Sequence, residues 1–545
     1  MDLLWRACCV LAVVMAGAAR PSAGRALNTS DYLEQRQAML AQEQTDIMGQ
    51  DIVLTAAEEE ANKVLMAAKD LEMEDGFETL NFIPSKNFLT MVQQMEASQV
   101  YKLIKKMPKG AALHVHDTAL ASSAWVVEEL TYWPNLYMCY DMYNQLFFRF
   151  FETPDTSCDW NLVSDVRASY PSPDEFDAEI FRRLTLLTED PDERYPDINT
   201  VWSIFQGYFI AITDLVMYRP AWEAYLYHAL QEFADDNVLY VEFRGTLPLL
   251  YELNGTRLTE EESVAVYQST AQRFLQDHPN TFFGTRFIYA PPRRVDNTTM
   301  STYIALVKQL KAQFPDFVAG FDLVGQEDLG QPLINFVDLL LELSEADIKV
   351  FYHAGETAWM GMESDENLID ALLLNASRIG HGYAIAKHPR AKEMALEKNV
   401  PMEVCPISNQ VLKLVEDLRN HPAATLVAEG FPIVVSSDDP GAWGAVALSH
   451  DFYEAFMALG GAKADLRFLK QLAINSINYS SLSEEDKVQL MLRWVEKWDE
   501  YVDTAPMLLS SNHSLAQQDE AAEPQTSTQP PPSPSSYPTV TTIGG

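Results

Sequence analysis

Positive charge is scarce in this sequence of 545 residues. Lys and Arg together number 39, whereas Asp and Glu number 78, and the formal net charge is −39 at neutral pH. Such a surface repels the phosphate backbone of nucleic acids. We therefore expect no nucleic-acid partner, and a neutral or cationic small substrate, or a basic receptor or matrix surface, fits the charge better.

Long apolar runs are scarce as well. The clearest one, residues 7–19, follows Arg6 and precedes small residues, which is the pattern of a secretory signal peptide; we assign residues 1–24 to it. A membrane anchor is the weaker alternative, because the run is shorter than the about 20 residues that span a bilayer. No later run is longer, so the sequence predicts a secreted, extracellular chain without a membrane span.

Cysteine is rare, and the few cysteines are consistent with secretion. Of five, Cys8 and Cys9 lie in the predicted signal peptide. Cys139 and Cys158 are near neighbours in a loop-like region and can close a disulfide in an oxidising compartment. Cys405 lies in an apolar run and is predicted to be a buried thiol. Six glycosylation sequons agree with this compartment: Asn28, Asn254, Asn297, Asn375, Asn478 and Asn512.

Residues 25–106 are acidic and helical in pattern. Asp31 and Thr55 each precede a Glu by three residues, as in a helix capping box, and a break near Gly49 indicates two helices. Their apolar stripes need a partner surface. That partner is either the main domain or, if the helices form an arm, a second copy of the chain in a homodimer.

A different rhythm begins after residue 106. Short, continuously apolar runs alternate with helix-like segments, as in a parallel sheet covered on both faces. Eight such runs predict a (β/α)₈ barrel over residues 107–505, at 111–116, 238–245, 281–290, 317–325, 348–356, 378–384, 400–408 and 431–440. A doubly wound open sheet is disfavoured, because no glycine-rich phosphate fingerprint follows the first run.

Two segments interrupt or follow this alternation. Residues 120–200 are dense in aromatics and hold Cys139 and Cys158, which predicts a disulfide-stapled insertion after the first strand. Its aromatics either form a small core or provide a surface for another macromolecule. Residues 506–545 end in a stretch rich in Pro, Ser and Thr, and we predict a disordered tail there.

The reactive residues lie at strand ends. His114 and His116 point to the same face of the first strand, but such a pair alone is often a surface or core feature. Further ionisable residues close three other strands: His353 and Glu356, then His381, then Asp438 and Asp439. A barrel gathers the carboxyl ends of its strands at one site, and these groups are costly to bury without a purpose.

The residue types predict metal-assisted hydrolysis. Three imidazoles and one carboxylate suit Zn²⁺ with an open position for water, whose pKa the ion lowers towards neutrality. Glu356, three residues beyond His353, can handle protons, and His381 can hold the attacking water. No Lys closes the fourth strand to bridge two metals, so we expect one Zn²⁺ per chain.

Six motifs resemble those of the adenosine deaminases of the amidohydrolase superfamily: MPKGAALHVHD, FDLVG, HAGET, RIGHG, EVCPISN and SSDDPG. The signal peptide, the acidic helices and the insertion resemble the secreted type, the adenosine deaminase-related growth factors. The resemblance covers roughly residues 30–505. It implies a zinc-dependent barrel that deaminates adenosine, and 2′-deoxyadenosine, to inosine and ammonia, and it implies a homodimer.

The resemblance also implies roles for single residues. Glu356 would pass a proton to the purine N1, and His381 would orient the attacking hydroxide. The metal ligands would be His114, His116, His353 and Asp438. The substrate contacts would be Asp117 on the ribose hydroxyls, Trp202 on the pocket wall, Gly325 at the purine N3 edge and Asp439 at N7.

Two alternatives stay open at this point. The residues by themselves do not choose adenosine over adenine, AMP or a modified nucleoside. The acidic surface and the aromatic insertion also suit a growth-factor-like signalling protein that acts through a cell-surface receptor, with a glycosaminoglycan as a further extracellular partner.

Overall fold

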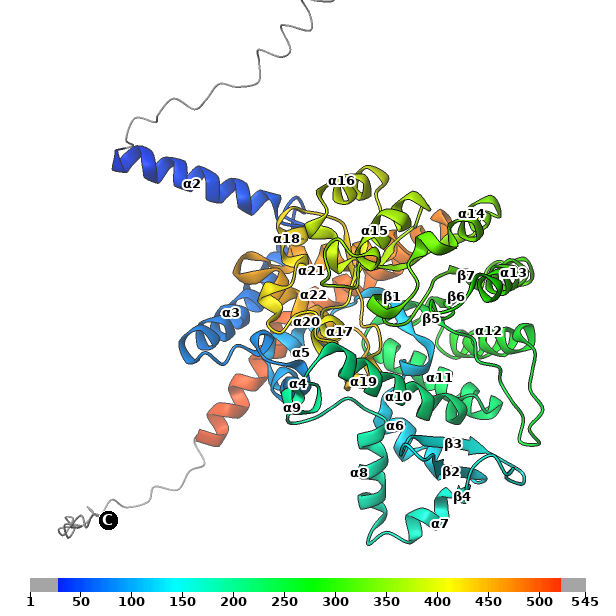
Figure 1. Cartoon of the computed structure of the whole chain (residues 1–545). Helices are drawn as coiled ribbons and strands as arrows, with labels where there is room; N and C mark the ends of the chain where they lie inside the picture. The colour runs from blue at the N-terminus through cyan, green and yellow to red at the C-terminus, as the bar shows by residue number, and fades with distance from the viewer. Residues whose placement is uncertain (1–27, 521–545) are drawn as a thin grey trace, which may run out of the picture.

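The computed structural model describes residues 28–520, with side chains to residue 507, and its centre is a curled parallel sheet (Figure 1). The strands follow one another in the order β1-β5-β6-β7-β8 and β12-β11-β10-β9. Their bounds are β1 Gly110–His116, β5 Val238–Gly245, β6 Gly284–Tyr289, β7 Val318–Phe321, β8 Lys349–Val350, β9 His353–Ala354, β10 Ile379–His381, β11 Met402–Val404 and β12 Ile433–Val435.

Hydrogen bonds at two junctions close this sheet into a barrel. Beyond β12, the Asp438 N–H donates to the His114 carbonyl at 3.0 Å, and the His116 N–H donates to the Asp438 carbonyl at 2.9 Å. Between β8 and β9, the Phe351 N–H bonds towards β7, whereas the Tyr352 carbonyl accepts from Gly380 of β10. The two short strands thus act as one, and the predicted (β/α)₈ barrel is confirmed.

Several strands are shorter than the apolar runs that predicted them. The run 348–356 is broken into β8 and β9. The run 400–408 ends its strand at Val404 because Pro406 opens α17 (Pro406–Val411), and the run 431–440 is likewise followed by α19 (Pro440–Trp443). Proline favours the first turn of a helix, since its missing N–H is not needed there.

Helices follow the strands and cover the barrel (Figure 1). They bury one apolar face each, as α21 does through Leu466, Leu469 and Leu472. The covering helices are α11 Arg219–Asp235, α12 Glu260–Asp277, α13 Asn297–Gln313, α14 Val337–Glu345, α15 Glu363–Leu373, α16 Pro389–Lys398, α18 Ala423–Ala428, α20 Ser449–Glu454 and α21 Leu466–Asn478. Short turns complete the loops: η2 Asp117–Ala119, η4 Glu327–Leu329, η5 Leu333–Phe336, η6 Tyr383–Lys387, η7 Leu418–Asn420, η8 Ala455–Leu459 and η9 Gly461–Lys463.

The last helix, α22 (Glu484–Glu520), ties the barrel to the N-terminal helices. The buried Trp494 indole donates to the Pro108 carbonyl at 2.9 Å, and the Trp498 indole donates to Glu58 of α3 at 2.7 Å. The helix continues past residue 505, where the sequence predicts the start of a disordered tail. Residues 521–545 and the predicted signal peptide lie outside the described residues.

The N-terminal region consists of α2 Thr29–Asp46, α3 Ala56–Thr79, η1 Ile83–Ser85, α4 Phe88–Ala97 and α5 Gln99–Lys106. The predicted capping box at Thr55 is confirmed, and Gly49 lies in the break between α2 and α3. The predicted start at Asp31 is wrong. Asn28 caps α2 instead, because its side chain accepts the Asp31 N–H at 3.0 Å.

The two long N-terminal helices differ in their contacts. Ala61 and Leu65 of α3 are buried against the main domain. By contrast α2 projects from the body and buries no residue, and its Leu33 and Leu40 are 56% and 47% exposed (Figure 1). Packing on the main domain therefore accounts for the apolar stripe of α3 but not for that of α2.

The insertion after β1 forms a small antiparallel sheet of order β3-β2-β4 below the barrel (Figure 1). Its core includes the buried Phe148, Phe150 and Phe176. The predicted disulfide between Cys139 and Cys158 is present, and Cys405 is a buried free thiol. The elements of this part are α6 Ser123–Glu128, η3 Leu130–Tyr132, β2 Leu136–Tyr140, β3 Leu146–Phe150, β4 Asn161–Leu162, α7 Val163–Ala168, α8 Pro173–Arg183, α9 Pro191–Arg194 and α10 Ile198–Val216.

Within residues 28–520, no helix combines the length and the apolar character that crossing a membrane requires.

Candidate active site

Four predicted metal ligands meet at the carboxyl end of the barrel. His114 and His116 lie on β1, His353 begins β9, and Asp438 follows β12. One donor atom of each lies within 4.8 Å of the others. The Asp438 Oδ1 atom lies 3.3 Å from His114 Nε2 and 2.9 Å from His116 Nε2. Residues that are far apart in the sequence therefore form one compact donor set.

This donor set fits a divalent metal ion. The buried atoms His114 Nε2 and Asp438 Oδ1 have no hydrogen-bond partner among the described residues. A buried polar atom normally has one. Imidazole nitrogens with a carboxylate oxygen are the ligands that Zn²⁺ takes in catalytic sites. Asp438 also has φ +58°, a left-handed conformation that non-glycine residues adopt rarely and mostly at functional sites.

Two buried carboxylates orient the histidines from outside the donor set. His114 Nδ1 lies 2.7 Å from Glu403 Oε2, and His353 Nδ1 lies 2.7 Å from Asp322 Oδ2. Asp322 also accepts the His353 backbone N–H at 2.8 Å. Such carboxylates hold a proton on Nδ1, which leaves Nε2 free for a metal.

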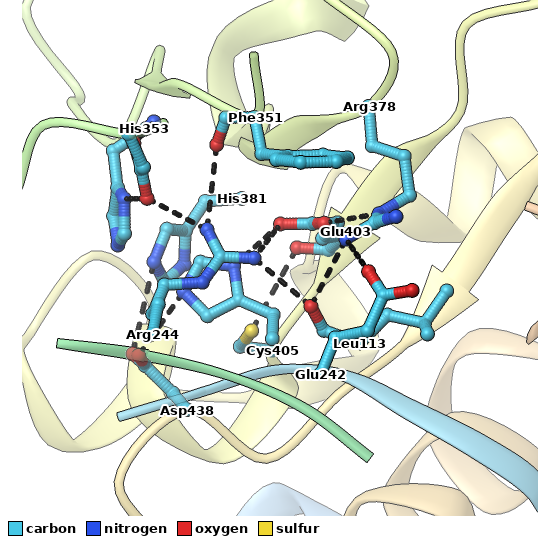
Figure 2. A network of polar contacts seen from close by, with 12 residues as sticks. Leu113, Glu242, Arg244, Phe351, His353, Arg378, His381, Glu403, Cys405 and Asp438 are labelled. Atoms are coloured by element: carbon cyan, nitrogen blue, oxygen red, sulfur yellow. Dashed lines mark hydrogen bonds and ion pairs between the residues drawn. The ribbon is translucent and has the colours of Figure 1, made fainter. Parts of the chain in front are cut away.

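Two buried arginines neutralise these carboxylates (Figure 2). The Arg244 guanidinium lies 2.7 Å from Asp322 and 2.8 Å from Glu403, and Arg378 lies 2.5 Å from Glu403 and 2.9 Å from Glu242. Burial opposes ionisation of Glu403, but Arg244 and Arg378 outweigh it and hold its pKa well below the usual range. His353 and Arg244 do the same for the pKa of Asp322.

This network was not predicted from the sequence, although the sequence contains a signal for it. Each member is a charge inside a run that otherwise predicts a buried strand. Arg244 lies in VLYVEFRG, Asp322 in FVAGFDLVG, and Glu403 in VPMEVCPIS. A charge at such a position must be paired, because an isolated buried charge is very costly.

Glu356 and His381 lie beside the four predicted metal ligands, and their pKa values are shifted in opposite directions. His381 Nε2 lies 3.6 Å from Glu356 Oε1 and 3.7 Å from Asp438 Oδ2. Burial raises the pKa of Glu356 well above its usual value, and the nearby Asp438 and Glu327 carboxylates add to this. Burial lowers the pKa of His381 well below its usual value. A protonated carboxyl and a neutral imidazole thus face the same space.

A cavity of about 220 Å³ opens next to these groups. Its wall on one side is α10, whose Trp202, Phe205 and Phe209 lie one helical turn apart along one face. The remaining lining residues are His116, Asp117, Thr118, Gln206, Thr213, Gly245, Thr246, Val324, Gly325, His353, Glu356, His381, Asp438 and Asp439. All predicted catalytic and substrate residues therefore reach one cavity. The sequence analysis did not identify Phe205, Gln206, Phe209 or Thr246.

The predicted substrate residues lie at different parts of this cavity. Burial raises the pKa of Asp117 to about 7, and a side chain at Gly245 would collide with its carboxylate. Gly325 has φ +104° and faces open space. Burial, and the charge of the adjacent Asp438, raise the pKa of Asp439 well above its usual value. Asp117 Oδ2 and Asp439 Oδ1 are buried without a hydrogen-bond partner among the described residues.

The predicted glycosylation sites are exposed where the structure describes their side chains. This is the case for Asn28, Asn254, Asn297, Asn375 and Asn478, whereas the side chain of Asn512 lies outside the described ones. Their glycosylation stays a prediction.

A closed barrel with a histidine pair on its first strand, further histidines on β9 and β10 and an aspartate after β12 has the donor set of a hydrolase that could use a metal ion. Comparison with known proteins makes this more specific. The family model "Adenosine deaminase" matches residues 186–498, and the model "Adenosine/AMP deaminase N-terminal" matches residues 9–104. The chain belongs to the adenosine deaminase family, is of the adenosine deaminase 2 type, and is a hydrolytic deaminase, as the motifs predict.

Curated relatives and solved structures agree with this assignment. The chain is 45% identical to adenosine deaminase 2 of Homo sapiens over 475 residues, which are 86% of this chain and 93% of that protein. It is also 45% identical to the adenosine deaminase of Phlebotomus duboscqi over 475 residues, 86% of this chain and 91% of that protein.

Two solved structures share the fold. The arabidopsis N6-mAMP deaminase is 18% identical with a TM-score of 0.53, and the match covers 72% of this chain and 99% of that one. An amidohydrolase from Burkholderia ambifaria with bound Zn is 19% identical with a TM-score of 0.50, covering 74% of this chain and 94% of that one.

Proposed function

We propose that this protein is a secreted, zinc-dependent enzyme that hydrolyses adenosine and 2′-deoxyadenosine to inosine and ammonia and so lowers extracellular adenosine. The observation that carries the proposal is the placement of Glu356, a carboxyl that burial keeps protonated, beside His381 and the donor set at the base of an aromatic-walled cavity. The curated relatives that cover most of the chain are named adenosine deaminases.

Zinc is the metal that the donor set favours, and one structural neighbour contains it. Bound by His114, His116, His353 and Asp438, one ion per chain would supply the Lewis acidity that lowers the pKa of water towards neutrality. The buried, mutually close donor atoms with unpartnered Nε2 and Oδ1 support this assignment.

The residues of the chain account for the remaining chemistry. Glu356 donates its proton to the purine N1, which makes C6 electrophilic. His381 is neutral because it is buried, and its Nδ1 accepts a hydrogen bond from the Asn409 amide at 3.1 Å. Its proton is therefore on Nε2, which donates a hydrogen bond to the oxygen of the attacking water and orients it towards C6. As the new C6–O bond forms, one proton of the water passes to Glu356 and replaces the proton given to N1. The second proton passes to the amino group, the C6–N6 bond breaks, and ammonia leaves. The protonated Asp439 carboxyl donates to N7, and Asp117 binds the ribose hydroxyls.

Glu356→Gln tests this mechanism. We expect zinc to remain at one ion per chain while kcat falls about 10²–10⁴-fold, the usual contribution of a general acid. Loss of the adenine absorbance band, followed for adenosine, 2′-deoxyadenosine, adenine and AMP, measures turnover and substrate choice. Glu363→Gln, an exposed site at the start of α15, is the matched control. Full turnover in Glu356→Gln would refute the mechanism, and a preference for adenine or AMP would refute the substrate.

We also propose that the enzyme is a homodimer held through α2. Its Leu33 and Leu40 are exposed, and nothing else in the described part of the chain covers them. Leu33→Glu with Leu40→Glu should convert a dimer to a monomer in light scattering without changing the disulfide-linked insertion.

Receptor signalling is the second candidate function, favoured by Met142 and Tyr143, which are 87% and 82% exposed at the tip of the β2–β3 hairpin. Such a tip suits a cell-surface receptor, or the protein core of a glycosaminoglycan-bearing partner. Cell stimulation that survives in Glu356→Gln but disappears in a Met142→Ser, Tyr143→Ser variant would establish it; stimulation lost with catalysis would refute it.

A further inference from the structure

One buried carboxylate binds the backbone on which Glu356 stands. Glu327 begins η4, in the loop that follows β7, and is buried. Its Oε1 atom accepts the Gly355 N–H at 3.0 Å, and its Oε2 atom accepts the Glu356 N–H at 2.6 Å. A single side chain thus bonds two consecutive amides of the segment that carries the general acid.

Two further side chains complete this support. The Asn367 amide of α15 donates to Glu327 Oε1 at 2.6 Å. The buried Arg293 guanidinium lies 3.6 Å from the same oxygen and donates to the carbonyls of His353 at 2.7 Å and Leu323 at 3.0 Å. Glu327 therefore holds the N–H groups of the turn after β9, and Arg293 holds the carbonyl of His353 at the start of β9.

The conformation of this turn explains why it needs a carboxylate. Gly355 has φ +76°, and a side chain there would lie 2.7 Å from Leu368. With this backbone the N–H groups of Gly355 and Glu356 point to the same side, which forms a small anion-binding concavity. Both are buried donors that need an acceptor. A carboxylate offers one oxygen to each, whereas an amide would place its NH₂ against one of them.

We propose that Glu327 is a positioning residue for Glu356: it holds the backbone of residues 355–356 so that the Glu356 carboxyl reaches the purine. Glu327 does not line the cavity, so it acts through Glu356 and not on the substrate. The inference rests on the proposed role of Glu356.

Glu327→Gln tests the proposal. We expect kcat for adenosine to fall about 100-fold while KM stays within about threefold and the zinc content stays at one ion per chain, because small displacements of a catalytic group cost about this much. An unchanged kcat would overturn the proposal. Glu327→Asp keeps the carboxylate but moves it away from the two N–H groups, so kcat should fall about tenfold. This variant provides the measurement if Glu327→Gln does not fold.

Asp236→Asn is the matched control. The buried Asp236 carboxylate also accepts two consecutive N–H groups, from Leu448 at 3.0 Å and Ser449 at 2.9 Å, with the Lys109 ammonium 3.5 Å away. It precedes β5, at the end of the barrel opposite the cavity. We expect Asp236→Asn to lower the melting temperature as much as Glu327→Gln does but to keep kcat. An equal loss of kcat in both would mean that general destabilisation is the cause.

A double-mutant comparison separates positioning from any independent role. In the Glu356→Gln background, adding Glu327→Gln should reduce the residual kcat by less than about threefold, since the group being positioned is already gone. A further loss of about 100-fold would overturn the proposal. Full activity of Glu356→Gln would refute the proposed function itself, whereas a fully active Glu327→Gln beside an inactive Glu356→Gln would refute only the positioning.

Discussion

Two pairs of buried carboxylates share one end of the barrel, and their surroundings differ. Asp322 and Glu403 face Arg244 and the metal-binding histidines, and their pKa values are held well below the usual range. Glu356 and Asp439 form no ion pair with Lys or Arg within the described residues, and their pKa values are raised well above it.

The difference shows how one site can hold a cation and also donate protons. The paired carboxylates are ionised and orient imidazoles for the metal. The unpaired carboxylates keep their protons and can donate hydrogen bonds to ring nitrogens. The pairing of Arg244 with Asp322 and Glu403, and not with Glu356 or Asp439, therefore assigns the roles.

The largest effect is expected for Arg244→Met, which removes the difference between the paired and the unpaired carboxylates. It leaves Asp322 and Glu403 buried without their shared cation, and breaking a buried pair from one side costs about 3–5 kcal/mol. We expect a large fall in the melting temperature and loss of bound zinc, measured by calorimetry and metal analysis. Arg390→Met, at a surface pair whose arginine is 90% exposed, should change neither. If Arg244→Met were as stable as wild type, Arg244 would not be the cation that stabilises the buried Asp322 and Glu403 carboxylates.

Asp439→Ala removes a proton donor from the unpaired group. Losing one buried hydrogen bond to N7 costs about 1–3 kcal/mol, so kcat/KM for adenosine should fall about 10–100-fold with zinc retained. Asp439→Asn should lose less, because an amide can still donate. The paired assay is 7-deazaadenosine, which lacks the acceptor and should be equally poor for wild type and Asp439→Ala. If Asp439→Ala lowered kcat/KM for 7-deazaadenosine as much as or more than for adenosine, the N7 contact would be excluded.

Asp322→Asn removes the charge of a carboxylate that is paired with Arg244 but keeps the size and shape of the side chain. We expect zinc affinity to fall about 10–100-fold, as for other carboxylates that orient a metal-binding histidine. Competition with a chelator measures it. Asp236→Asn again provides the comparison, since Asp236 is buried but far from the histidines. If wild type, Asp236→Asn and Asp322→Asn bound zinc with equal affinity, Asp322 would not orient His353.

The smallest expected effect is on stability. A carboxyl with a raised folded-state pKa binds its proton more tightly when folded, so its stabilising contribution is complete below the unfolded pKa and is lost as pH rises through the folded pKa. In metal-free protein, Glu356→Gln should therefore raise the melting temperature by about 1–3 °C at pH 8 but not at pH 4. An equal shift at both pH values would mean that Glu356 is not protonated in the folded state.

The compact donor set and the fold could be predicted because their patterns are local. His114 and His116 share a strand face, and the other candidates close strands of a type that the apolar runs reveal. The disulfide followed from the short spacing of Cys139 and Cys158. The predicted helix start at Asp31 failed because a better cap, Asn28, lies three residues earlier.

The supporting residues could not be predicted as a set. Arg244 and Glu403 lie on β5 and β11, and Asp322 directly follows β7; only closure of the barrel brings Arg244 within 3 Å of both carboxylates. Glu327 and Glu356 are separated by 29 positions and meet only because β7 pairs with β8, which leads through β9 to Glu356. Nothing in the local pattern indicates that one would bond the backbone of the other.

The sequence by itself determined which groups are available: a barrel of alternating strands and helices, three histidines and an aspartate that can hold a metal, and a glutamate that can transfer a proton. The tertiary structure alone decided which of these side chains are protonated and which atoms they face. A pKa depends on what surrounds a side chain after burial, and whether Arg244 or other carboxyl groups lie beside a carboxylate depends on contacts between distant strands. The exposure of α2 was decided in the same way, since its apolar stripe shows no partner until the chain is folded.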